Sequence, residues 1–145
     1  MKKLILVLSF YFSFLTLSAQ PQQRKFDKEK FNAELTQYIT TQASLTPQEA
    51  AAFFPLYEEM QAKQRVLFQK KKKSGKTKPA DEKTCKQVII ENDRLEIEMK
   101  EIQAQYHKKF LNVLPASKLY DVLKAEEHFY RRAFKRVAHK HKGNR

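Results

Sequence analysis

The sequence predicts an all-α fold, with four helices in an elongated hairpin-like arrangement after an N-terminal signal peptide. Two observations lead to this prediction. The 145 residues include only two glycines, Gly75 and Gly143, and tight hairpin turns depend on glycine because it adopts positive φ at little cost. Apolar side chains also recur every three or four residues over four long stretches, which is the periodicity of one helical face.

The first 19 residues have the three-part layout of a secretory signal peptide. A positive start, Met1–Lys3, precedes an uncharged stretch at residues 4–17, and small residues end the segment at Ala19. The uncharged stretch is shorter than the about 20 residues that a membrane-spanning helix needs. We therefore expect cleavage after Ala19 and a periplasmic product, with an uncleaved N-terminal anchor as the alternative.

The chain is strongly basic, with 29 Lys and Arg against 16 Asp and Glu. Such an excess attracts acidic partners and favours solubility. Because an exported protein meets little nucleic acid, we expect no nucleic acid; the better candidate partners are acidic segments of other proteins, anionic lipid head groups or envelope polysaccharide. The single cysteine, Cys85, excludes an internal disulfide framework. Its phase with apolar neighbours favours burial, and an intermolecular disulfide across a dimer is the alternative.

The helical domain is expected to span residues 26–138, after a polar leader at 20–25 that we expect to be disordered. A first helix is predicted for 26–43, because apolar residues there fall at helical spacing. They are Phe31, Leu35, Tyr38 and Ile39.

The second helix begins with a clear local signal. Thr46 is a good N-cap, Pro47 fits the first helical position, and Glu49 completes a capping box. Pro55 predicts a bend in the first turns. The apolar face of this helix is formed by Phe53, Tyr57, Met60, Gln64 and Leu67, with Phe54 and Phe68 beside it.

The remaining elements follow from a lysine run and a proline. Residues 70–78 hold six lysines and no acid, which predicts a turn. A third helix is expected from 81 to 113, roughly 50 Å long, with coiled-coil-like spacing. Leu114-Pro115 ends it and starts a fourth helix that runs to 138, followed by a frayed basic tail at 139–145. Because long helices with excess apolar positions bury little surface alone, we expect a homodimer.

The stretch Leu45-Thr46-Pro47-Gln48-Glu49 resembles the Leu-Thr-x-x-Gln motif of the Spy/CpxP family of periplasmic proteins, which usually occurs twice, each time at the head of a helix. Two positions depart from the motif. Glu49 replaces its glutamine, and the second copy, Leu114–Lys118, has proline for threonine and lysine for glutamine. The resemblance implies cradle-shaped helical dimers that act as ATP-independent chaperones or as sensors of envelope stress. The motif residues carried over are Leu45, Thr46, Pro47 and Glu49.

No residue grouping in the sequence is typical of an enzyme. There is no Ser-His-Asp or Cys-His arrangement with a loop to present it, and no glycine-rich loop, so we predict neither catalysis nor a cofactor. Three histidines are the candidates for metal binding, His128, His139 and His141, but none of their pairs has the i, i+4 spacing that places two imidazoles on one helical face. We expect them to be solvated.

The candidate client-binding surface combines the lysine run with the cations and aromatics of the fourth helix. We expect the two segments to meet if the fourth helix folds back along the third. Positive charge would speed encounter with acidic clients, and aromatic contact would slow their release. The residues are Lys70, Lys71, Lys72, Lys73, Phe129, Tyr130, Arg131, Arg132, Phe134, Lys135 and Arg136.

The leading functional hypothesis is an ATP-independent, chaperone-like protein that binds unfolded or misfolded envelope proteins in the periplasm. The alternative is an envelope-stress or metal-stress sensor that acts on a membrane-bound partner, an anti-sigma factor or a sensor kinase. A third possibility is a basic structural protein on anionic lipid or polysaccharide.

Overall fold

The computed structural model describes residues 27–142, and this range contains four helices and no strand. The helices are α1 (Lys28–Gln42), α2 (Pro47–Ser74), α3 (Glu82–Phe110) and α4 (Ala116–Lys142). The all-α, four-helix prediction is therefore confirmed for the described part of the chain. The expected signal peptide at 1–19 and leader at 20–25 lie outside the described residues.

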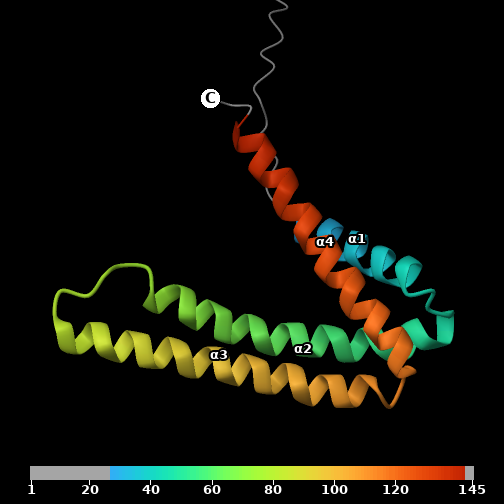
Figure 1. The fold of residues 1–145 in the computed structure, drawn as a ribbon, viewed down its shortest axis with the longest axis horizontal. Coiled ribbons are helices and arrows are strands. Elements are labelled where there is room, and N and C mark those ends of the chain that lie inside the picture. Colours follow the sequence, from blue (N-terminus) through green and yellow to red (C-terminus); the bar gives the residue numbers. More distant parts are fainter. Residues whose placement is uncertain (1–26, 143–145) are drawn as a thin grey trace, which may run out of the picture.

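The helices form two antiparallel pairs that diverge like the arms of a V (Figure 1). One arm is the long hairpin of α2 and α3, and the other is the pair of α1 and α4. The condition that α4 folds back along α3, on which the expected meeting of the lysine run and the α4 cations depended, is not met. Phe129 of α4 packs instead against the rings of Phe31 and Tyr38 on α1, with centroids 5.2 and 5.7 Å apart.

The hydrophobic core lies where the two arms meet. All four helices contribute to it, and Phe53, Tyr106 and Phe110 are among its most deeply buried side chains. Toward the far end of the hairpin, the buried side chains among the described residues are reduced to Leu67 and Leu95. The far half of the hairpin is thus a two-helix projection with little interior.

Two helices are longer than the sequence pattern indicated. Lys70–Lys73 form the last turn of α2 instead of a loop, because lysine is a good helix former and cations at a helix C-terminus interact favourably with the helix dipole. The helix then ends at Gly75. α4 continues to Lys142, past the expected end at 138. Conversely, α3 ends at Phe110, and residues 111–114 form turns before Pro115.

The capping box at the start of α2 is present as predicted. The backbone N–H of Glu49 donates to the Thr46 hydroxyl at 3.2 Å, and the Thr46 N–H donates to the Glu49 carboxylate at 2.8 Å. Leu45, just before the cap, is buried in the core. The motif therefore both starts the helix and anchors its first turn.

Replacing Thr46 by alanine should lower the free energy of unfolding by about 1 kcal/mol, because one helix N–H loses its acceptor. Replacement by serine keeps the hydroxyl and should be nearly silent. Urea denaturation followed by circular dichroism measures both variants. Equal losses in the two variants would show that the hydroxyl does not cap the helix.

Candidate binding groove

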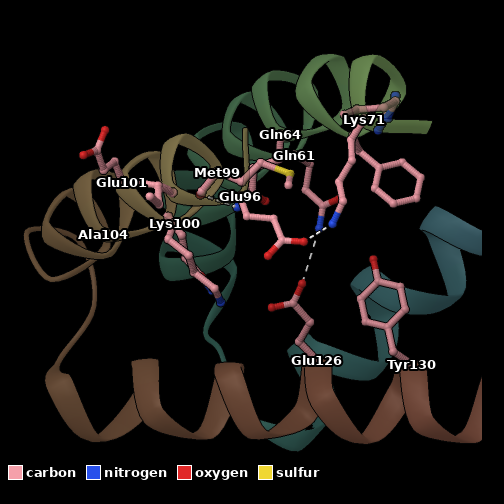
Figure 2. A pocket seen from close by; sticks show the side chains of 14 residues that line it. Gln61, Gln64, Lys71, Glu96, Met99, Lys100, Glu101, Ala104, Glu126 and Tyr130 are labelled. Atoms are coloured by element: carbon pink, nitrogen blue, oxygen red, sulfur yellow. Dashed lines mark hydrogen bonds and ion pairs between the residues drawn. The ribbon is translucent and has the colours of Figure 1, made fainter. Parts of the chain in front are cut away.

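A groove of about 1130 Å³ lies in the angle between the hairpin and α4. Figure 2 shows its residues: Glu126 and Tyr130 point from α4 toward the hairpin, and side chains of α2 and α3 form the opposite wall. The groove exists because α4 diverges from the hairpin instead of packing along it. Its lining residues are Gln61, Gln64, Arg65, Phe68, Lys71, Glu96, Ile97, Met99, Lys100, Glu101, Gln103, Ala104, Glu126 and Tyr130.

The hairpin wall exposes large apolar side chains. Phe68 of α2 is 59% exposed and Ile97 of α3 is 60% exposed, and both line the groove. Ile90 is 56% exposed and lies seven residues before Ile97, which places it on the same face of α3 nearer the hairpin tip. This wall is therefore apolar well beyond the groove itself.

The wall formed by α4 also exposes apolar side chains. Tyr130 is half-buried and lines the groove. Phe134 and Val137 follow it by four and seven residues and so share its helical face. They are 71% and 54% exposed. Both inner walls of the V therefore present apolar side chains to solvent.

Charged residues at the groove are of both signs. Lys71 of α2 forms an ion pair with Glu96 of α3 across the hairpin. Arg65, Lys100 and Glu101 also line the groove. The rim is consequently mixed in charge, whereas the sequence had suggested a purely cationic surface.

A polar cluster that includes the groove residues Gln61 and Glu126 connects the two arms. The Tyr57 hydroxyl donates to the Glu126 carboxylate at 2.6 Å, and the Gln61 amide donates to the Tyr57 hydroxyl at 2.8 Å. Burial raises the pKa of Glu126, and the hydrogen bond from Tyr57 partly opposes this rise. Burial also raises the pKa of Tyr57, so its hydroxyl remains a donor.

The raised pKa of Glu126 predicts a pH-dependent stability. Because the folded chain holds this proton more tightly than the unfolded chain, stability from this group falls as pH rises from the ordinary value of 4.5 through the raised one. Glu126→Gln removes the ionisation and keeps an oxygen to accept from Tyr57. The variant should be more stable than the wild type at neutral pH, and the difference should vanish below pH 4.5. Chemical denaturation at several pH values measures this; a variant that is less stable at neutral pH would contradict it.

The two motif-like segments meet in space. The Lys118 ammonium lies 2.5 Å from the Glu49 carboxylate and donates to the Ser44 carbonyl at 3.2 Å. Its hydrogen bond is the main cause that lowers the pKa of Glu49. The two departures from the motif, Glu49 and Lys118, thus form an ion pair that ties the start of α4 to the start of α2.

The expected client-binding residues do not form one surface. Figure 1 shows the hairpin tip, next to Lys70–Lys73, and the C-terminal end of α4 at the far ends of separate arms. The physical reason is the pairing of α4 with α1. Lys70, Lys72, Lys73, Arg131, Arg132, Lys135 and Arg136 are exposed, and Lys71 is half-buried.

Phe129 must be removed from the candidate binding residues. It is 7% exposed and belongs to the core, because α1 covers its side of α4. Tyr130 is half-buried at the groove, and Phe134 is the exposed aromatic of the three. Arg132 lies over the ring of Tyr38, 5.4 Å from its centroid.

The sequence pattern did not single out the polar cluster or the groove. Phe68 stood out only as an apolar position beside the face of the second helix. Glu126 falls at helical spacing among apolar positions of α4, and a carboxylate at such a position is a signal of a buried polar contact. The partners of Glu126 could not be identified, because Tyr57 lies 69 residues away in the chain.

The histidine and cysteine candidates occupy different environments. His128 and His139 are exposed on α4, and the side chain of His141 lies outside the described part. Within the described residues, no three His, Cys, Asp or Glu side chains are grouped to hold a metal ion. Cys85 is half-buried, with its sulfur 3.6 Å from the Pro79 carbonyl.

Comparison with protein-family models, curated proteins and solved structures finds no match to this chain. Among the described helices, none combines the length and the apolar character needed to cross a membrane.

Proposed function

We propose that this protein is an ATP-independent, chaperone-like binding protein of the periplasm that holds unfolded or misfolded envelope proteins, and that it is not an enzyme. The observation that supports this most is the apolar lining of both inner walls of the V. Soluble monomers rarely leave large apolar patches exposed unless the patch binds something. Phe68 and Ile97 on one wall and Tyr130 on the other line the same groove.

The distribution of charge supports a binding process in two stages. Exposed cations lie toward the open ends of both arms, Lys70, Lys72 and Lys73 on the hairpin and Arg131 and Lys135 on α4. Long-range attraction to an acidic client would speed encounter, and contact with the apolar walls would slow release. An open groove suits such clients better than a closed pocket, because extended segments of many sequences can enter it.

The resemblance to the Spy/CpxP family adds support through the motif at the start of α2. The capping box, Thr46 with Glu49, is formed, and the second motif-like segment is paired with it through Lys118. The family and the periplasmic location are part of the proposal. The location rests on the N-terminal segment at residues 1–19, which lies outside the described residues.

We also propose a homodimer. Val66 does not line the groove and is 54% exposed. A second copy of the chain could cover it and leave the groove accessible. Sedimentation velocity of the mature chain at several concentrations measures the oligomeric state directly.

The test of function is an aggregation assay with two unrelated, chemically unfolded proteins and no ATP. We expect the mature chain to reduce light scattering from both, and to do so more slowly at high salt, because salt screens the attraction between exposed charges. Failure with both clients would contradict the proposal. Tight binding to a single anti-sigma factor or sensor kinase, without any effect on the two clients, would instead establish the regulatory alternative.

A further inference from the structure

At the tip of the α2–α3 hairpin, α3 extends beyond the end of α2. The Ser74 hydroxyl at the end of α2 donates to the Asn92 side chain at 2.8 Å, so α2 ends beside the middle part of α3. Residues 82–91 of α3 extend past that point, and only the connecting loop 75–81 accompanies them (Figure 1). The first turns of α3 therefore have no helix packed beside them.

The tip carries a dense positive charge. Residues 70–90 contain eight lysines and two acids, Asp81 and Glu82. Of these lysines, Lys71 is the one that forms an ion pair within the described residues, and the other seven are exposed. The charge is therefore available to an external anionic partner.

Aliphatic side chains are exposed within this cationic region. Ile89 is 62% exposed and Ile90 is 56% exposed, and both follow Lys86 by about one helical turn. The core of the molecule does not need them, since it lies at the opposite end of the hairpin. Exposed isoleucines beside lysines are typical of surfaces that rest in the headgroup layer of a membrane, where cations meet phosphates and aliphatic groups leave water.

An anionic lipid surface fits these observations better than an anionic polysaccharide or nucleic acid. All three partners offer negative charge to the lysines. A lipid surface alone also offers an apolar phase for Ile89 and Ile90. Apart from Lys71, the tip lysines form no ion pair within the described residues. Their side chains can therefore bind lipid headgroups, which move within a fluid surface to meet the charges.

We propose that the tip of the α2–α3 hairpin docks on an anionic phospholipid surface. Exposed lysines of the tip, such as Lys70, Lys72 and Lys73, contact the lipid phosphates, and Ile89 and Ile90 enter the interfacial layer. The core end of the molecule and α4 then extend away from the surface. Lys70, Lys72, Lys73 and Ile90 also belong to the surface proposed for clients, but the flotation test below contains no client, so its failure is distinguishable from a failure of client holding.

Flotation of the mature chain with vesicles tests this proposal. Vesicles that contain phosphatidylglycerol should carry the protein, and vesicles of phosphatidylcholine alone should not. Each lysine near an anionic surface contributes about fivefold to partitioning, so replacing Lys70, Lys72 and Lys73 by Gln should lower binding by roughly a hundredfold. The matched control replaces three exposed cations of α4, Arg131, Lys135 and Arg136, and should have little effect.

The isoleucines separate lipid from other anions. Ile89→Ser with Ile90→Ser should weaken vesicle binding by about tenfold and leave binding to heparin and to DNA unchanged, whereas Leu111→Ser at the other end of the hairpin should not matter. Circular dichroism should show that all these variants stay folded, since the replaced side chains are exposed. Equal binding to both kinds of vesicle, equal losses in the α4 control, or vesicle binding that is indifferent to Ile89 and Ile90 would each overturn the proposal.

Discussion

Replacing Phe53 by alanine is expected to lower the free energy of unfolding by about 3–5 kcal/mol. Its side chain is completely buried, and its ring contacts those of Tyr57 and Phe110, with centroids 5.5 and 4.8 Å apart. The truncation leaves a cavity where α2 and α3 meet the other arm. Small domains have only about 5–15 kcal/mol of stability, so a large part of the fold's stability depends on this residue.

Urea denaturation followed by circular dichroism measures the loss at Phe53. Phe68→Ala is the matched control on the same helix, because this side chain is 59% exposed and its removal should change stability by less than about 0.5 kcal/mol. Similar losses in the two variants would show that the core does not lie at the junction of the arms.

Phe129→Ala is expected to have the second largest effect, again about 3–5 kcal/mol. The ring holds α4 against α1 through its contacts with Phe31 and Tyr38. Phe134→Ala, five residues further along α4, removes a ring that is 71% exposed and should leave stability unchanged. The denaturant midpoints of both variants measure these stability losses. Equal stability losses would contradict the pairing of α4 with α1.

The starts of the helices could be predicted, because they depend on local chemistry. Thr46 and Glu49 close each other's backbone donors within four residues, and Pro115 directly precedes the start of α4 at Ala116. The end of α2 could not be predicted in the same way, because four successive lysines occur both in solvated loops and in the last turn of a helix. The helix dipole and the propensity of lysine favour the helix here.

The angle between the arms could not be predicted from the sequence. The apolar pattern of α4 includes both Phe129 and Phe134, and nothing local shows which of them is covered. α1 determines which side of α4 is covered, because its Phe31 and Tyr38, from a distant part of the chain, pack on Phe129. The groove depends on the same angle, so it could not be predicted either.

The contact between Glu49 and Lys118 also depends on parts of the chain that are distant in sequence. Each residue is a departure from the motif when its segment is considered alone. The two lie 69 positions apart, so their opposite charges suggest a pair only when the segments are known to meet. In the structure, the second segment has no capping hydroxyl at Pro115, and its lysine stabilises the capping box of the first segment instead.

The most direct test of the account is client holding by a groove variant, Phe68→Ser with Ile97→Ser, measured by light scattering without ATP. Both side chains line the groove and are exposed, so the variant should fold normally. We expect it to hold both unfolded clients at least about tenfold more weakly than the wild type, because burial of each apolar side chain contributes of the order of 1 kcal/mol. A control variant, Leu111→Ser with Tyr120→Ser, removes side chains of similar exposure, 50% and 61%, outside the groove and should hold clients normally. Unchanged holding by the groove variant, or equal losses in both variants, would contradict the claim that the inner walls of the V bind clients.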